Sequence, residues 1–362
     1  MERRIHEQII KGCMHDIHIS ESEIYVDNEA RRRSGHMSHA MVDMDNGKFM
    51  IFNSNCSATR ALGHGNYGWI EYRISDDYCH SFGEIREFPY AKQCFLNGDC
   101  TVSVEKAVAC DDGTVVAFCL RNSIYTEGCS EPWDSCMVVR SHDKGETWDD
   151  ATLFCKHKGR IYDACYHNGV IYALIFCNDA SILFTGNNPL HVYRLYKSED
   201  SGRTFEEVCV LPLENTLAHA YCAMTFNDEG EMIVYVYNAG DERNLDYLIS
   251  PDCGKTWTRS GKSYCHNKIR NPQINRLDGQ YILHGRAGAG AGFVLYTSAD
   301  GIEWDDGVLL DTLKPSCYYS NSVIIHEPGQ PDVMLIKFSE LYSPVGVSKC
   351  VNGMLARLTS IK

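Results

Sequence analysis

The segment Ser141–Trp148, with the sequence SHDKGETW, decides the fold because the chain repeats it. The pattern S-x-D-x-G-x-T-(W/F) returns at Ser198–Phe205 (SEDSGRTF) and at Ser250–Trp257 (SPDCGKTW). Ser298–Trp304 (SADGIEW) is one residue shorter, and Ser75–Phe82 (SDDYCHSF) is a divergent copy. Successive copies start 66, 57, 52 and 48 residues apart, which is the spacing of structural repeats joined by loops of variable length.

Each copy predicts a tight turn between two strands, because Asp bonds nearby backbone amides and Gly tolerates positive φ. A second pattern lies upstream of every copy and predicts a hairpin. It consists of a strand, a polar turn that ends in Gly, and another strand, as in KAVACDDGTVVAF (Lys106–Phe118). Asx-Gly between alternating apolar runs is a strong hairpin signal. Six such hairpins are expected, with the turn glycines Gly47, Gly113, Gly169, Gly230, Gly279 and Gly329.

Six hairpins and five outer turns predict an all-β fold of six antiparallel units, each with four strands. Four-stranded sheets repeated around an axis form a β-propeller, in which each blade covers the face of the next. We therefore expect a six-bladed β-propeller with no helical layer, and residues 1–362 as a single domain. The sixth unit, from Tyr319 onward, lacks an outer turn, so the N-terminal segment is expected to supply its last strand and close the ring.

Composition excludes several classes of protein. The 48 acidic residues outnumber the 34 basic ones, and the net charge of −14 disfavours a nonspecific nucleic-acid surface, which needs a basic stripe. No apolar run of about 18 residues is present, so no membrane-spanning helix is expected. The charged first 17 residues do not resemble a secretory leader. With 18 cysteines and no C-x-x-C pair, this predicts mostly free thiols and a cytoplasmic protein, with a secreted mature form as the alternative.

The S-x-D-x-G-x-T-W turn resembles the Asp box, or BNR repeat, of the sialidase (neuraminidase) superfamily, and the resemblance covers nearly the whole chain. It implies a glycoside hydrolase that cleaves a terminal acidic sugar, sialic acid or a relative, from a glycan, with retention through a tyrosine nucleophile. Asp boxes also occur in other glycosidases, in polysaccharide lyases and in non-catalytic propellers, so the chemistry must be argued from the site. The resemblance makes the turn carboxylates structural: Asp143, Asp200, Asp252 and Asp300.

Propeller geometry indicates where the pocket lies. The first strand of each hairpin runs from the pocket face to the turn glycine and the second strand returns, so residues about eight before and after that glycine converge on one rim. This rule selects polar side chains from every unit, among them His39, Glu105, Arg121, Asp163, His219, Tyr221, Arg270, Asn271, Arg286, Tyr319 and Glu340. Several arginines, carboxylates and histidines on one rim exceed what packing requires and indicate a pocket.

The resemblance implies roles for some of these residues. Sialidases hold the substrate carboxylate with arginines, because a planar guanidinium binds a carboxylate bidentately. Arg286 resembles the arginine that ends a blade's second strand in that family, and Tyr319-Ser320 resembles the family's Tyr-Ser nucleophile. The other residues that we expect to bind substrate are Arg121, Arg270, His39, His219 and Asn271.

The catalytic acid and base are less well marked. Glu105 and Asp163 begin innermost strands that are otherwise apolar, where a carboxylate is costly unless it is paired or functional. We therefore treat both as catalytic candidates, with a salt bridge to a rim arginine as the alternative. The loop where the family carries its acid, Ser57–Gly68, has no Asp or Glu, and His64 is its only obvious proton-transfer group. Asn271 occupies a position where the family has Glu.

Two other functions fit the same residues. A polysaccharide lyase would neutralise a uronate with arginine and abstract a proton with Tyr or with one of the rim histidines, which are His39, His64, His219 and His284. A non-catalytic glycan-binding propeller is the third candidate. In all three the partner is a carbohydrate, and neither nucleic acid nor membrane is expected. No His and carboxylate trio has metal-ligand spacing, so we expect no catalytic metal and no cofactor. The sequence allows a homo-oligomer.

Overall fold

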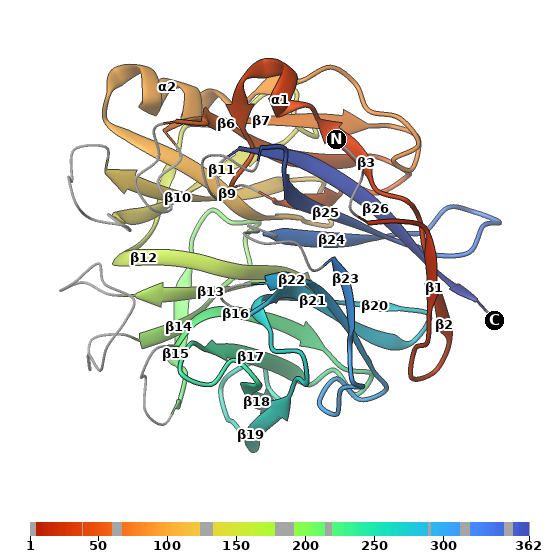
Figure 1. Ribbon diagram of the computed structural model, residues 1–362. Coiled ribbons are helices and arrows are strands. Elements are labelled where there is room, and N and C mark those ends of the chain that lie inside the picture. Colours follow the sequence, from red (N-terminus) through yellow and green to blue (C-terminus); the bar gives the residue numbers. More distant parts are fainter. Residues whose placement is uncertain are drawn as a thin grey trace. The chain divides into compact units, whose positions relative to one another are not determined.

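The computed structural model describes residues 5–37, 39–59, 67–123, 133–177, 192–213, 219–288, 291–311, 319–343 and 350–361. The chain divides into two compact units. Unit 1 comprises Met1–Arg31 with His219–Lys362, and unit 2 comprises Arg32–Ala218. Nearly all of the regular structure is β, and each unit is built from antiparallel sheets (Figure 1).

Unit 2 contains three groups of antiparallel strands. The first group has the order β4-β6-β7-β8, with β5 also paired to β6: β4 (Arg33–Ser34), β5 (Met41–Asp43), β6 (Phe49–Ser57), β7 (Gly68–Ser75) and β8 (Arg86–Glu87). The other two groups follow in chain order: β9 (Cys100–Ala109), β10 (Val115–Ser123), β11 (Ser135–Ser141), β12 (Thr152–His167), β13 (Val170–Cys177), β14 (Val192–Ser198) and β15 (Glu206–Val210).

Strand β12 joins the second and third groups of unit 2. Its first part pairs with β11 and its second part with β13, so one strand of 16 residues is the last strand of one group and the first strand of the next. The sequence did not predict this continuity. The consequence is a single seven-stranded sheet from β9 to β15.

Unit 1 also contains three groups of strands. Two of them have four strands in chain order. The first consists of β16 (His219–Phe226), β17 (Met232–Asn238), β18 (Asn244–Ser250) and β19 (Arg259–Tyr264). The second consists of β20 (Arg270–Leu277), β21 (Gln280–Ala287), β22 (Ala291–Ser298) and β23 (Val308–Asp311). The third joins the two ends of the chain: β24 (Ser320–Ile325), β25 (Val333–Leu341), β26 (Val351–Ile361), β2 (Asp16–Ile19), β1 (Gln8–Ile10) and β3 (Glu23–Val26).

The N-terminal segment therefore completes the last sheet, as the sequence predicted. β2 runs antiparallel to β26, with Ile17 opposite Ser360, and β3 pairs with β26 nearer the start of that strand. The short helix α1 (Asn28–Arg31) follows β3, and the amide of Asn28 donates to the Asn352 side chain at 2.8 Å.

All six predicted hairpins are present, and their turn glycines have φ between 77° and 88°. At Gly113 a Cβ atom would meet no atom within 4 Å, so the left-handed backbone conformation, and not a lack of space, favours glycine there. The hairpin prediction is thus confirmed in detail.

Four of the five outer turns share one set of hydrogen bonds, and in the shorter turn at Ser298 the amides of Ile302 and Glu303 donate to Asp300 instead. In the turn that begins at Ser141, the serine Oγ donates to Asp143 (2.9 Å) and accepts from the Gly145 amide (2.8 Å). Thr147 donates its amide and its hydroxyl to the two oxygens of Asp143, at 2.8 Å and 2.6 Å. The divergent turn keeps the pattern, with Cys79 in the place of glycine at a φ of 62°.

These bonds stabilise the ionised carboxylates. The hydrogen bond from the Thr147 hydroxyl is the largest cause that lowers the pKa of Asp143 to about 2, and the Ser81 hydroxyl does the same for Asp77. The oxygens of these carboxylates accept hydrogen bonds from groups of their own turns, which agrees with a structural role.

The aromatic residue that closes an outer turn packs against the preceding group of strands. Trp148 stacks edge-on against Phe88 at 4.8 Å and donates its indole N–H to the Tyr72 hydroxyl at 3.1 Å. Phe205 lies 5.8 Å from Phe118 in the same way, ring centre to ring centre. Each repeat therefore supplies both a turn and an apolar contact to its neighbour, which is how stacked blades bury their faces.

Within each unit the first strands of the groups are neighbours. β20 lies beside β16 and β24, and β9 lies beside β5 and β12. This is the arrangement that propeller blades require inside each unit. Closure of the six groups into one ring, and the single domain that it implies, stay predictions.

The longer of the two described helices was, like α1, not expected from the sequence. α2 (Pro89–Asn97) follows β8, begins with proline and ends at Gly98, whose φ of 74° forms a left-handed cap. Proline at the first helical position and glycine just beyond the last are helix boundary signals, so FPYAKQCFLNG carried enough information to find it.

Candidate functional site

Four of the sequence-predicted site residues come together in unit 1, at the strand ends remote from the glycine turns. They are Arg270, Asn271, Arg286 and Tyr319. Tyr221 in β16 and Tyr237 in β17 join them. We call Tyr221, Tyr237, Arg270, Arg286 and Tyr319 the tyrosine–arginine cluster.

A local irregularity in β20 shapes this end of the sheet. Asn271 has a φ of 56°, and the pairing of β20 with β21 shifts between Arg270 and Gln273. The bulge is accommodated by Gly285, where a Cβ atom would lie 2.7 Å from the Asn271 carbonyl oxygen and 2.8 Å from that of Arg270. Glycine is required there because the two backbones approach so closely.

The two arginines of the cluster lie directly opposite each other, Arg270 on β20 and Arg286 on β21. Like charges at directly opposite positions of a sheet are unfavourable unless something compensates them. The buried Nε atoms of both arginines lack a hydrogen-bond partner among the residues that the structure describes. Unpartnered guanidinium donors are chemically suited to contact an anion.

The tyrosines surround these guanidinium groups. Cζ of Arg286 lies 5.6 Å from the centre of the Tyr319 ring, and Cζ of Arg270 lies 5.7 Å from each of the Tyr221 and Tyr237 rings. The hydroxyl oxygens of Tyr221 and Tyr319 are 3.3 Å apart. Burial opposes the charge of Arg270, but the phenols of Tyr221, Tyr237 and Tyr319 outweigh it and raise the pKa of this arginine.

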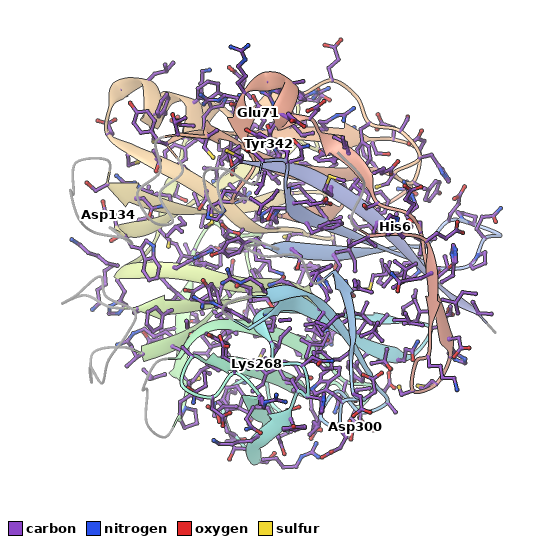
Figure 2. All side chains as sticks on the ribbon, in the orientation of Figure 1. His6, Glu71, Asp134, Lys268, Asp300 and Tyr342 are labelled. Carbon is purple, nitrogen blue, oxygen red and sulfur yellow. The ribbon has the colours of Figure 1, made fainter. Side chains whose placement is uncertain are left out.

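A carboxylate that the sequence reasoning missed lies beside the cluster. Tyr237 donates its hydroxyl to Glu242 Oε1 at 2.7 Å, and Lys268 (labelled in Figure 2) lies 3.9 Å from Oε2. Gly288 has a φ of 74°, and a Cβ atom there would lie 2.6 Å from Glu242 Oε2. The sequence analysis considered residues about eight positions from each turn glycine. Glu242 lies farther from Gly230, in the loop after β17, so it was not selected.

The candidate carboxylates Glu105 and Asp163 lie in unit 2, and each has a basic partner. Arg160 Nη2 is 3.5 Å from Glu105 Oε1, and Lys106 Nζ is 2.9 Å from Asp163 Oδ1. All four side chains are largely buried, and they connect the first strands of two adjacent groups, β9 and β12. Glu105 pairs with an arginine, as the alternative to catalysis predicted, whereas Asp163 pairs with a lysine, and the catalytic roles stay predictions.

Two further substrate-binding candidates, Arg121 and His39, also lie in unit 2. Arg121 is 3.5 Å from Asp134 Oδ2, and it approaches Cys100, whose pKa is lowered to about 7 mainly by a hydrogen bond from Cys94 and then by Arg121. His39 is buried, with Nε2 3.3 Å from the His36 carbonyl oxygen.

The three remaining candidate histidines are His64, His219 and His284. His64 lies outside the described residues, and for His219 the structure describes only its place in β16, opposite Asn238. His284 has Nδ1 3.0 Å from the Ser320 hydroxyl and Nε2 3.0 Å from the Ser322 hydroxyl, so the serines of β24 hold its ring.

Glu71 is another buried carboxylate of unit 2 that the sequence analysis did not select. Glu71 in β7 accepts a hydrogen bond from the Asn55 amide at 2.6 Å, and Arg33 donates to the other end of the same amide at 2.5 Å (Figure 2 labels Glu71). Because Glu71 lies on the third strand of its group, a rule restricted to the first two strands could not select it.

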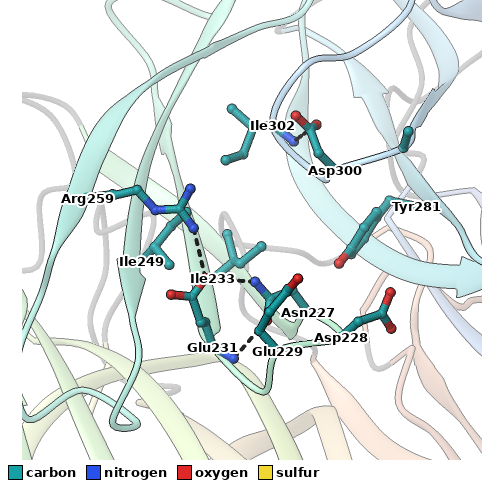
Figure 3. Close-up of a pocket in the computed structure, with 11 residues that line it drawn as sticks. Asn227, Asp228, Glu229, Glu231, Ile233, Ile249, Arg259, Tyr281, Asp300 and Ile302 are labelled. Atoms are coloured by element: carbon teal, nitrogen blue, oxygen red, sulfur yellow. Dashed lines mark hydrogen bonds and ion pairs between the residues drawn. The ribbon is translucent and has the colours of Figure 1, made fainter.

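A cavity of about 480 Å³ opens at the other end of β16 and β17, next to the Gly230 turn (Figure 3). Its polar residues are bonded to one another: Glu231 accepts from Asn227 and from Arg259, at 2.9 Å and 2.8 Å. None of the sequence-predicted site residues lines it.

Within the described ranges, no group of three or more His, Cys, Asp or Glu residues has the geometry of a metal site. The described helices also include none that is long and apolar enough to cross a membrane.

No family model and no curated protein matches the chain. Solved structures do match. A protein of unknown function from Dyadobacter fermentans superposes with a TM-score of 0.71 at 14% identity, over 95% of this chain and 99% of that one. A Hadza microbial sialidase gives a TM-score of 0.71 at 11% identity, over 94% of this chain and 69% of that one.

An intramolecular trans-sialidase from Ruminococcus gnavus, solved with oseltamivir carboxylate, gives a TM-score of 0.62 at 12% identity, over 94% of this chain and 97% of that one. At these identities the likeness shows the fold alone. The fold is sialidase-like.

Proposed function

We propose that this protein is a sialidase-type glycoside hydrolase, and that the tyrosine–arginine cluster of unit 1 binds and cleaves a terminal acidic sugar. The observation that carries the proposal is the opposed pair Arg270 and Arg286, whose Nε atoms lack partners among the described residues, with the Arg286 guanidinium beside the Tyr319 ring. The sialidase-like fold supports the same chemistry by analogy.

The arginines are suited to the carboxylate of the sugar. A guanidinium presents its N–H groups in a planar fork that matches the two oxygens of a carboxylate. A bound carboxylate would also relieve the repulsion between the two opposed cations. We also expect the Asn271 side-chain oxygen, which lacks a partner among the described residues, to accept a hydrogen bond from a sugar hydroxyl.

Tyr319 is the proposed nucleophile. Its oxygen bonds to the anomeric carbon while the glycosidic C–O bond breaks, and the leaving oxygen takes a proton from an acid. Water then cleaves the aryl glycoside bond between the tyrosine oxygen and the anomeric carbon and gives its proton to the base form of that acid, so the anomeric configuration is retained. A phenolic oxygen meets less repulsion from the substrate carboxylate than a second carboxylate would. The identity of the acid stays a prediction from the sequence.

Proton abstraction by histidine, as in a lyase, gains less support from the described residues. Both ring nitrogens of His284 contact serine hydroxyls, and His39 is buried against a backbone carbonyl. We therefore place the hydrolase first.

The first experiment is an assay of the purified protein with a sialoside that releases a fluorescent aglycone, alongside a uronate polymer. Release of the aglycone supports the hydrolase. Near-ultraviolet absorbance from an unsaturated sugar would identify a lyase instead. Binding of sialic acid by calorimetry without turnover of either substrate would identify a glycan-binding protein and contradict the proposal.

A further inference from the structure

We infer that Tyr221 activates Tyr319, so that the nucleophile works as one member of a pair of hydrogen-bonded phenols. This inference rests on the function proposed above. It adds a positioning residue that the sequence pattern did not select as catalytic.

The geometry favours a shared proton. The two hydroxyl oxygens are 3.3 Å apart, and the rings meet edge-on with their centres 6.4 Å apart. Both side chains are buried, Tyr221 at 4% and Tyr319 at 5% exposure. When one phenol of such a pair ionises, the other donates a hydrogen bond to it, and a charge-assisted bond of this kind is stronger than a neutral one.

Burial opposes ionisation of the pair, and the two arginines of the cluster act against that effect. Arg270 lies over the Tyr221 ring and Arg286 over the Tyr319 ring, so each phenol has a guanidinium beside it. A cation next to a phenol favours the phenolate. Tyr237, the third phenol, is occupied elsewhere because its hydroxyl donates to Glu242 at 2.7 Å.

Tyr237 and Glu242 instead hold Tyr221 in position. The rings of Tyr221 and Tyr237 lie 5.6 Å apart, and the hydrogen bond to Glu242 fixes the Tyr237 ring. On the other side, the Ser339 amide of β25 donates to the Tyr319 carbonyl at 3.0 Å. β25 adds two more charged residues next to this contact, Lys337 and Glu340, both buried.

The proton balance is simple. Before attack the pair loses one proton to solvent, and the proton that remains lies on Tyr221 and is donated to the Tyr319 oxygen. That oxygen then bonds to the anomeric carbon as the glycosidic bond breaks, and the leaving oxygen takes a proton from the general acid. In the second step water adds its oxygen to the anomeric carbon and gives its proton to the base form of that acid, so the Tyr319 phenolate is released and its bond from Tyr221 is restored.

The decisive variant is Tyr221→Phe, which keeps the ring and removes the hydroxyl. We expect KM to change less than 2-fold, kcat at neutral pH to fall about 10-fold or more, and the pH at which kcat/KM reaches its plateau to rise by about one unit or more, since one pKa unit is a factor of ten. An unchanged pH profile in this variant would overturn the inference while leaving the proposed function intact.

Tyr235→Phe is the matched control. Tyr235 is a buried tyrosine of the same strand as Tyr237, but its hydroxyl donates to the Gly301 carbonyl at 2.7 Å, outside the cluster. Its loss removes a buried phenol hydroxyl, so the variant should melt at a lower temperature and keep the wild-type pH profile.

A spectroscopic titration separates failure of the inference from failure of the proposed function. The ultraviolet absorbance of tyrosinate should show one tyrosine in the wild-type protein that ionises at lower pH than the others. Both Tyr221→Phe and Tyr319→Phe should abolish that step, and Tyr235→Phe should not. If the step is present and no sialoside is cleaved, the pair is real and the proposed function is wrong. If the step is absent, the inference is wrong.

Discussion

The guanidinium carbon of Arg286 lies 5.6 Å from the centre of the Tyr319 ring, which brings the end of β21 against the residue that precedes β24. These two strands belong to adjacent groups of unit 1. Because the charge of Arg286 is next to the phenol, binding of an anion and attack by the tyrosine can take place at neighbouring atoms of one substrate. Removing each side chain should therefore impair a different step.

Arg286→Ala should weaken binding of a carboxylated sugar. Loss of a bidentate contact to a buried charge costs about 2 to 5 kcal/mol, which corresponds to roughly a 30-fold rise or more in KM or Kd. The control is Arg276→Ala, because Arg276 pairs with Asp228 at the opposite end of β20. Normal affinity in the Arg286 variant would show that the site lies elsewhere.

Tyr319→Phe should spare binding and remove most turnover, because only the hydroxyl takes part in the chemistry. Calorimetric titration with sialic acid should give a Kd within about 3-fold of the wild-type value, a difference below 1 kcal/mol. A covalent adduct with a fluorinated sialoside, detected by mass spectrometry, should form on the wild type alone. A variant that turns over substrate at the wild-type rate would exclude Tyr319 as the nucleophile.

Asp163→Asn should destabilise unit 2, since it leaves the Lys106 ammonium buried beside a neutral group. Breaking one side of a buried ion pair costs about 3 to 5 kcal/mol. The double variant Asp163→Asn with Lys106→Met should recover part of the loss in chemical denaturation. Should Asp163→Asn instead melt normally and lose activity, the carboxylate is catalytic and not structural.

Asp143→Asn should reduce stability at neutral pH by about 1 kcal/mol, because the turn loses charge-assisted hydrogen bonds at an exposed position. The folded pKa of Asp143, about 2, is below its unfolded value of 3.8. Its contribution is therefore complete above pH 3.8 and is lost as the pH falls through 2.

The difference in melting temperature between wild type and this variant should accordingly shrink between about pH 4 and pH 2. Asp150→Asn, an exposed aspartate just beyond the turn, should show no such difference. A constant difference across this range would mean that the carboxylate charge does not support the turn.

The cysteines should be free thiols in the native protein. The 16 cysteines that the structure describes form no disulfide with one another. Thiol titration of the denatured, non-reduced protein should approach the 18 groups of the sequence. Four or more disulfides would contradict the prediction and, with it, the cytoplasmic location that we expect.

The hairpins and outer turns were predictable because their signals are local. A turn glycine with positive φ, or a Ser and an Asp that bond amides within four residues, acts within a few positions of the chain. The same holds for the closing strand β2, which was expected from a missing outer turn. Arg286 and Tyr319 were paired correctly because both lie at strand ends whose direction follows from those turns.

Other features depend on partners that are distant in the chain. The continuity of β12 could not be inferred, because two strands that are merely adjacent in sequence look the same as one long strand. Glu242 and Glu71 escaped a rule that counts residues from the turn glycine, since one lies in a loop and the other on a third strand.

The sequence by itself determined the all-β class, the six hairpins, the five turns and which strand ends carry polar residues. Each of these follows from backbone conformations and alternation of apolar side chains over short stretches. Only the tertiary structure decided which polar groups meet: Lys106 with Asp163, Tyr237 with Glu242, and Tyr221 with Tyr319. Such pairs form between strands of different hairpins, so their distances depend on register, bulges and packing, which no local pattern encodes.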